Sequence, residues 1–112
     1  MDKLRTVRGV NDLLPDALVK HNKVIEDALK ISNQYCYSQI ETPIFEFSEI
    51  FTKPLGISSD IVTKENYIFR DRSDDELMLR PEGTSGVVRA FLNAGLIQDI
   101  PKRFSYFGPM FR

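Results

Sequence analysis

The chain has 112 residues, of which 42% are hydrophobic and 28% are charged. This length allows one soluble domain at most, with a modest core. Fifteen basic residues against sixteen acidic ones give a net charge of -1 and a pI near 5.8. A segment that grips nucleic acid mainly through its own surface normally carries a basic excess, so any such contact is expected to be local or to lie elsewhere.

Cys36 is the only cysteine in the chain, which excludes an intrachain disulfide and a cysteine-rich metal site. A lone thiol fits a reducing cytosol. No stretch reaches the roughly 20 apolar residues of a membrane span, and the basic start, Met1–Val10, lacks the apolar run of a secretory signal. We therefore expect a cytoplasmic protein with no membrane partner, and we assign no metal ligand.

The first expected element is a helix. Pro15 and Asp16 suit a first helical turn, where a missing N–H and a negative charge are both tolerated. Apolar residues then recur at helical spacing up to about Tyr35. They are Leu18, Ile25, Ala28, Leu29 and Ile31.

An extended segment follows at Tyr37–Phe45, which is rich in β-branched and aromatic residues. Pro43 cannot donate to a strand ladder, so it belongs at an edge, a bulge or an interface. Ser48–Phe51 is expected to form a single helical turn. Thr52–Glu65 carries proline, glycine and serine and is expected to be mostly loop.

A hairpin is predicted next, with strands at Tyr67–Arg70 and Leu77–Arg80 and a polar turn at Asp71–Asp75. A second helix is then expected to start with Thr84 as its cap and to end at Gly95. Its apolar face consists of Val87, Val88, Phe91 and Leu92.

We expect the two helices to share one core under one sheet, because both are amphipathic. Arg103–Arg112 is predicted to be a final strand, and the stop on a strand pattern is interpreted as a truncation. Hairpins outnumber regular βαβ crossovers in this order of elements. The predicted fold class is α+β with an antiparallel sheet flanked by helices.

One run places chemistry at the start of the second helix. In Leu79–Thr84, the carboxylate of Glu82, a flexible Gly83 and the hydroxyl of Thr84 meet where a strand becomes a helix. Such a place offers backbone donors beside an acceptor carboxylate and suits a ligand with an ammonium and a carboxylate. The competing interpretation, which the run alone favours, is that Thr84 caps the helix and Glu82 complements its dipole.

A second run, Gly108–Arg112, ends on an arginine. The planar guanidinium matches phosphate or carboxylate oxygens. The alternative is an arginine at a strand end with no ligand.

Taken together and in order, several runs resemble the class II aminoacyl-tRNA synthetases, and specifically the histidyl-tRNA synthetases. The similarity covers nearly the whole chain, and the Arg-Pro-Glu-Gly-Thr run is its most specific part. The matching runs are Arg8–Pro15, Ile40–Glu46, Ser59–Tyr67, Leu79–Ala90 and Tyr106–Arg112.

The resemblance implies a six-stranded antiparallel sheet flanked by helices, in a homodimer with a separate anticodon-binding domain. It implies that residues 1–112 are the N-terminal portion of the catalytic domain, cut within the second class motif. The implied activity joins L-histidine to ATP, supplied with Mg²⁺, to give histidyl-adenylate, and then charges tRNA(His). Only part of that active site would lie in this chain, and tRNA contacts would lie mainly outside it.

The resemblance also implies roles for single residues. Glu82 would accept from the α-ammonium of histidine, and Gly83 and Thr84 would hold the same end of the substrate. Arg112 would be the catalytic residue, binding the α-phosphate of ATP and the amino-acid carboxylate. Pro43 would lie at the dimer interface. Adenylate formation needs positioning and cationic stabilisation rather than a protein nucleophile.

Three positions depart from the family pattern: Cys36 stands where glycine is usual, Ile57 where glutamate is usual and Asn66 where methionine is common. If the backbone at Cys36 is left-handed, cysteine costs roughly 1 kcal/mol more than glycine there.

Two other functions stay open. The synthetase-like regulatory subunit of ATP phosphoribosyltransferase is implied to share the fold without aminoacylating, although its counterpart of Glu82–Thr84 is usually changed. A segment acting only in dimerisation would fold stably and bind no histidine.

Overall fold

The computed structural model describes residues 3–55 and 66–112. The expected loop up to Glu65, the family-like run that starts at Ser59 and the departure at Ile57 therefore lie largely or wholly outside the described residues. The chain forms two compact units, Met1–Cys36 and Tyr37–Arg112, and each is described by itself. No helix in the described part is long and apolar enough to cross a membrane.

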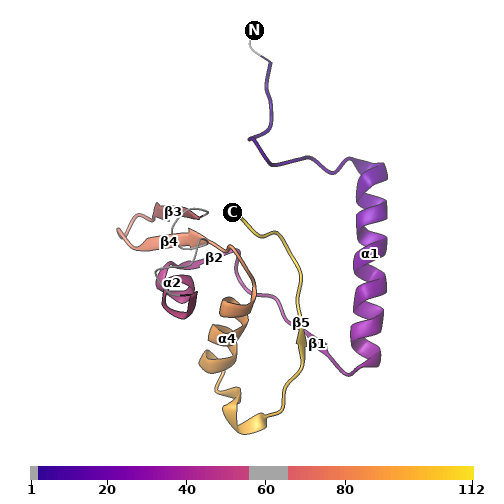
Figure 1. Ribbon diagram of the computed structural model, residues 1–112, viewed down its shortest axis with the longest axis vertical. Coiled ribbons are helices and arrows are strands. Elements are labelled where there is room, and N and C mark those ends of the chain that lie inside the picture. Colours follow the sequence, from indigo (N-terminus) through magenta and orange to yellow (C-terminus); the bar gives the residue numbers. More distant parts are fainter. Residues whose placement is uncertain (1–2, 56–65) are drawn as a thin grey trace. The chain divides into compact units, whose positions relative to one another are not determined.

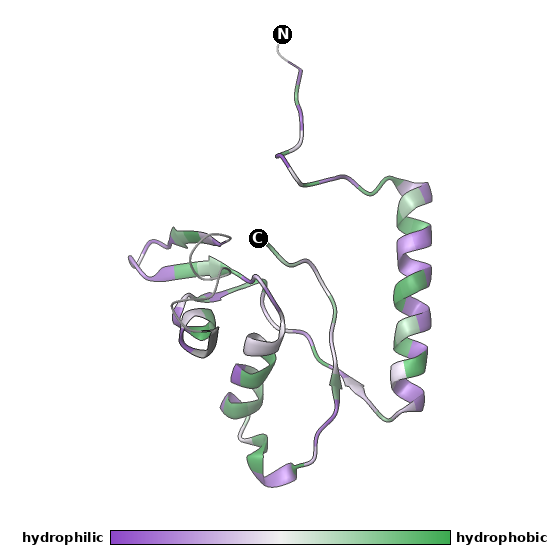
Figure 2. Cartoon of the chain, in the orientation of Figure 1, coloured by the Kyte–Doolittle hydropathy of each residue, from purple (hydrophilic) through white to green (hydrophobic). Residues whose placement is uncertain are grey.

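The first unit is built on helix α1, Pro15–Gln34, which begins at the predicted proline and runs for 20 residues. Apolar and polar bands alternate along it (Figure 2). No residue of α1 is buried, and Val24 is 70% exposed. The predicted core shared between this helix and the second one stays a prediction, since the units are described separately.

Charged residues on α1 interact along the helix. The Lys23 ammonium donates to the Asp27 carboxylate at 3.0 Å, one turn further on. This hydrogen bond, helped by the charge of Asp27, raises the pKa of Lys23. Both side chains are well exposed, so the pair adds little to stability.

The first unit ends on a residue with a left-handed backbone. Cys36 has a φ of 63° and follows the last turn of α1, where its N–H donates to the carbonyl of Asn33 at 3.0 Å. The backbone at this position is therefore left-handed, as the expectation required, and the cost stays a prediction. A residue with a Cβ costs roughly 1 kcal/mol more than glycine in this conformation.

The second unit opens on two short strands rather than one. β1, Ser38–Gln39, pairs in parallel with β5, Phe104–Ser105, and β2, Phe45–Phe47, belongs to a separate sheet. The predicted continuous stretch Tyr37–Phe45 is therefore interrupted. The break contains Pro43, which has no N–H to give to a ladder.

The main sheet is antiparallel, in the order β2–β4–β3 (Figure 1). β3, Tyr67–Arg70, and β4, Glu76–Leu79, are the predicted hairpin. Strand alternation places Met78, which is 1% exposed, on one face together with Glu46, its partner in register on β2. The predicted α+β class with an antiparallel sheet is confirmed, with the parallel β1–β5 pair as an addition.

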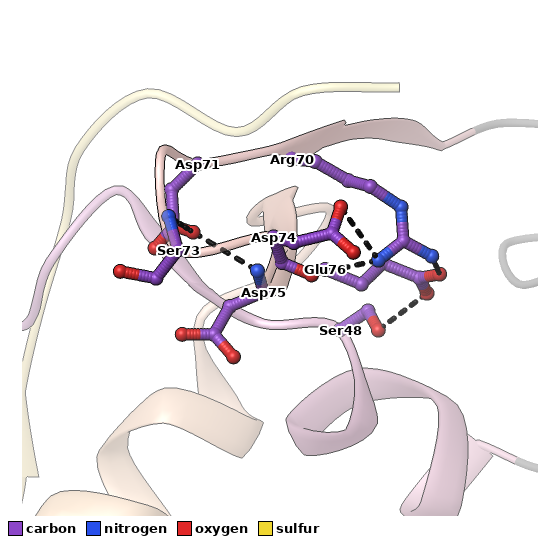
Figure 3. A network of polar contacts seen from close by, with 7 residues as sticks. All are labelled: Ser48, Arg70, Asp71, Ser73, Asp74, Asp75 and Glu76. Atoms are coloured by element: carbon purple, nitrogen blue, oxygen red, sulfur yellow. Dashed lines mark hydrogen bonds and ion pairs between the residues drawn. The ribbon is translucent and has the colours of Figure 1, made fainter.

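The turn of this hairpin is organised by one aspartate. The Asp71 carboxylate accepts hydrogen bonds from the N–H groups of Ser73 and Asp75, both at 2.9 Å (Figure 3). Asp74 lies between them with a φ of 64°, a conformation that aspartate tolerates better than most residues.

Figure 3 also shows how the hairpin is joined to the segment before α2. The Arg70 guanidinium donates to the carbonyl of Asp74 at 2.8 Å and lies 3.5 Å from the Glu76 carboxylate. That carboxylate accepts from the Ser48 hydroxyl at 2.7 Å. Arg70 and Glu76 thus connect the two ends of the turn, and Glu76 also joins the hairpin to Ser48, which follows β2.

Two helices accompany the sheet in this unit. α2, Glu49–Leu55, is longer than the single turn expected at Ser48–Phe51 and takes in the first residues of the expected loop. Its Phe51 is 1% exposed. α4, Thr84–Asn93, is followed by Gly95 with a φ of 67° and by the 3₁₀ helix η1, Leu96–Asp99. The helix stops near the predicted glycine.

The apolar face of α4 is only partly buried. Val87 is in the core, whereas Val88 and Leu92 are about half exposed. Within this unit, part of the predicted apolar face of α4 is therefore left exposed.

The last segment also differs from its prediction. Only Phe104–Ser105 is a strand, and residues 106–112 have no regular structure. A strand needs a series of backbone hydrogen bonds to a neighbour. Among the described residues, this segment makes one, from the N–H of Phe111 to the carbonyl of Arg80 at 2.9 Å.

Candidate amino-acid-binding site

The connection from β4 to α4 contains the predicted binding run. Arg80 and Pro81 are buried directly after the strand, Glu82 is half-buried, Gly83 is buried, and Thr84 is exposed at the start of the helix. A short connection between two packed elements leaves these residues little freedom. The backbone therefore places Glu82 and Thr84 on either side of Gly83 in one short turn.

The Glu82 carboxylate caps helix α4. It accepts from the N–H of Thr84 at 2.6 Å through Oε2 and from the N–H of Ser85 at 3.0 Å through Oε1. These are two of the amide groups that a helix leaves without internal partners. The N-cap residue is Gly83, and no N-cap side chain caps the helix, so the prediction that Thr84 is the cap is wrong.

This capping changes what the site offers to a ligand. Since Glu82 occupies the first two amides of α4, the turn does not present them as free donors for an anion. The carboxylate can accept more hydrogen bonds than the two amides supply. The turn therefore suits a cationic group such as an ammonium, rather than the carboxylate of the same ligand.

Tyr106, which is predicted only as the start of a family-like run, completes this corner. Its hydroxyl lies 2.6 Å from the Thr84 hydroxyl, and either oxygen can be the donor. Its ring lies directly over Gly83, where a Cβ would be 2.6 Å from Cε2 of the tyrosine and 3.1 Å from Cε of Met110. Glycine is required here for close approach of the aromatic ring to the turn.

An ion pair between the half-buried Arg89 and the buried Glu46 joins α4 to β2. Arg89 Nη2 donates to Oε1 of Glu46 at 2.9 Å, and Nε lies 2.7 Å from Oε2, although at an angle outside the range of a hydrogen bond. Gly86 lies close to the same pair: a Cβ there would be 3.2 Å from Oγ1 of Thr42 and 3.7 Å from Oε1 of Glu46, so the helix backbone approaches these side chains closely. Residues 43 positions apart form the pair, so neither was predicted.

The other predicted site residues lie apart from these contacts. Arg112 is exposed, and no hydrogen bond or ion pair is recorded for its side chain among residues 3–55 and 66–112. Pro43 is exposed between β1 and β2. The structure thus brings Gly83, Thr84 and Glu82 together, and leaves the roles of Arg112 and Pro43 as predictions.

No three side chains of histidine, cysteine, aspartate or glutamate gather to hold a metal ion in the described part of the chain.

Known proteins resemble this chain over most or all of its length. The family model described as histidyl-tRNA synthetase matches residues 9–112. The histidine–tRNA ligase of Rhodospirillum rubrum is 50% identical over 112 residues, which are 100% of this chain and 27% of that relative. The chain thus spans about a quarter of that protein's length.

Solved structures show the same fold. The apo histidyl-tRNA synthetase of S. aureus matches with a TM-score of 0.81 and 32% identity over 98% of this chain and 26% of its own. An ATP phosphoribosyltransferase regulatory subunit/histidyl-tRNA synthetase from Bacillus halodurans matches with a TM-score of 0.84 and 23% identity, over 100% of this chain and 28% of its own, which shows the fold alone. On the family match and the 50% identity, the chain belongs to the histidyl-tRNA synthetase family.

Proposed function

We propose that this chain supplies the amino-acid-binding edge of a histidine–tRNA ligase. The observation that carries the proposal is the turn at Glu82–Thr84, where a carboxylate is held by two backbone amides at 2.6 and 3.0 Å and stands beside a pair of hydroxyls 2.6 Å apart. A fixed acceptor of this kind suits the α-ammonium of an amino acid. The α-carboxylate of histidine then remains free to react.

In the proposed reaction, a carboxylate oxygen of L-histidine attacks the α-phosphorus of ATP. A new P–O bond forms, the bond to the β-phosphate oxygen breaks, and pyrophosphate leaves with that electron pair. A ribose hydroxyl of the terminal adenosine of tRNA(His) next attacks the carbonyl of histidyl-adenylate, and AMP leaves. Both steps depend on holding the reactants in line.

The chain's own residues would contribute positioning and charge. Glu82 binds the ammonium, Thr84 and Gly83 line the same end, and Arg112 donates to the α-phosphate and the histidine carboxylate as negative charge builds. Pro43 would lie in a homodimer interface. Mg²⁺ would arrive with ATP and be held by residues outside this segment. The tRNA(His) would also be bound mainly by residues outside it. The whole protein would act in the cytoplasm.

A chimera tests this proposal. In it, this chain replaces the matching 112 residues of the Rhodospirillum rubrum ligase, to which it is 50% identical. We expect exchange of pyrophosphate into ATP that depends on histidine and not on other amino acids. The parent ligase is the positive control.

Failure can take two forms. A folded chimera that binds histidine without catalysing exchange would contradict the proposal and favour the regulatory-subunit function. A folded chimera that binds no histidine would favour a role in dimerisation alone.

A further inference from the structure

The side chain of Arg80 is a buried cation whose role the proposed function leaves unexplained. It is 7% exposed and follows β4 directly. No carboxylate lies within ion-pair distance of it among the residues that the structure describes. A buried charge without a counter-ion is costly. The groups that the Arg80 side chain contacts should therefore explain why it is buried.

The guanidinium joins two segments that are far apart in sequence. Nε donates to the carbonyl of Pro109 at 2.9 Å, and Nη1 donates to the carbonyl of Thr42 at 3.2 Å and lies 3.4 Å from its hydroxyl. These acceptors belong to backbone outside the strands. Arg80 therefore supplies donors that a regular ladder would otherwise provide.

The backbone of Arg80 also joins the segment before β2 to the segment after β5. Its N–H donates to the carbonyl of Ile44 at 2.8 Å, and its carbonyl accepts from the N–H of Phe111 at 2.9 Å. Gly108 lies so close to the guanidinium that any Cβ there would collide with Nη2 of Arg80. Arg80 thus contacts this segment at three residues: its side chain contacts Gly108 and Pro109, and its backbone carbonyl accepts from Phe111.

We propose that Arg80 is a positioning residue for the phosphate end of the site: it fixes the path of residues 108–111 and thereby places Arg112 to meet the α-phosphate. This inference rests on the proposed function, because Arg112 has its role only there. It explains why an irregular segment at the end of a short strand can present an arginine in a fixed place. It also explains why the residue is arginine, since one planar group with several donors reaches both carbonyls.

The test compares Arg80→Lys with Arg89→Lys in the chimera. A lysine keeps the charge but cannot bridge Pro109 and Thr42 with the arginine geometry. We expect the ATP-dependent kcat/KM of exchange to fall roughly tenfold or more for Arg80→Lys, since hydrogen bonds from a charged group are lost. The KM for histidine should stay within about twofold, because Glu82 and Thr84 are left in place.

Arg89→Lys is the matched control, because it alters a half-buried guanidinium that touches Glu46 and not residues 108–111. It should lower the melting temperature without a selective effect on ATP. An Arg80→Lys enzyme that loses stability yet keeps its ATP kinetics, or that loses histidine and ATP dependence equally, would overturn the inference.

Amide hydrogen exchange gives a readout independent of catalysis. In Arg80→Lys, the amide of Phe111, which donates to the carbonyl of residue 80, should exchange faster than in the parent chimera, while exchange in α4 is unchanged. Unaltered exchange at Phe111 would contradict the positioning role even if activity fell. An inactive but folded parent chimera would instead count against the proposed function, and the exchange measurement would still test Arg80.

Discussion

The two units of the chain differ in how many of their side chains are buried. Helix α1 has a regular apolar stripe and buries none of it within its own unit, whereas the second unit buries polar and apolar groups side by side. Its buried polar residues are Thr42, Glu46, Ser48 and Arg80, and its buried apolar residues are Phe51, Leu77, Met78 and Val87. Periodicity alone thus specifies a helix, while the site is held by particular polar contacts that periodicity does not reveal.

Replacing Glu46 tests that difference most severely. In Glu46→Ala, Arg89 keeps its half-buried place without a partner, and we expect unfolding to become easier by about 2–4 kcal/mol. The urea midpoint of the chain, followed by circular dichroism, measures this change. Glu26→Ala on exposed α1 is the matched control and should change stability by less than about 0.5 kcal/mol. Equal effects at both positions would remove the contrast between the units.

The close approach at Gly83 gives the next effect. In Gly83→Ala, the added Cβ would press on the Tyr106 ring, which lies 2.6 Å from its position, and we expect a loss of about 1–3 kcal/mol. Combining it with Tyr106→Leu should recover part of the loss, because the ring is then gone. A double mutant that is as unstable as the sum of the single ones would show that the glycine is needed for another reason.

The junction between the units should give the smallest effect, with the opposite sign. Cys36→Gly relieves the left-handed backbone at φ 63° and should stabilise the chain by about 0.5–1 kcal/mol, partly offset by the freer unfolded state. Cys36→Ala is the control and should bring no gain, since alanine keeps the Cβ. A stabilised alanine variant would mean that the thiol, and not the backbone, is unfavourable.

Local signals in the sequence were sufficient for several elements. A proline at the first helical position predicted the start of α1, and an aspartate-rich turn between apolar runs predicted the β3–β4 hairpin. Motif resemblance predicted the family and the turn at Glu82–Thr84. Each of these depends on residues close together in the chain.

What the sequence did not predict depends on contacts between distant residues. The aromatic run after Ser105 is predicted to be a strand, but single contacts with Arg80 and Thr84 replace a ladder there. The pair of Glu46 and Arg89 and the hydroxyl contact of Tyr106 each join segments more than twenty residues apart. Thr84 is predicted as the cap because hydroxyls are frequent caps, whereas the structure has the Glu82 carboxylate accepting from the N–H groups of Thr84 and Ser85.

Glu82 is where capping and substrate binding must be separated, and two variants do so. Glu82→Gln keeps an acceptor oxygen for the helix amides but loses the charge, whereas Glu82→Ala loses both. Alanine should lower stability by about 0.5–2 kcal/mol through the lost cap. It should also cut kcat/KM for histidine about ten- to hundredfold, because a charge-assisted bond is worth roughly 1.5–3 kcal/mol.

The most direct measurement is therefore histidine-dependent pyrophosphate exchange by the Glu82→Gln chimera, with a thermal melt of the same sample. The account predicts a melting temperature close to that of the parent and a kcat/KM for histidine reduced about fivefold to tenfold, since a neutral acceptor replaces a charged one. The KM for ATP should be nearly unchanged. Normal histidine kinetics with a lowered melting temperature would show that Glu82 only caps the helix, and would contradict its assignment to the substrate ammonium.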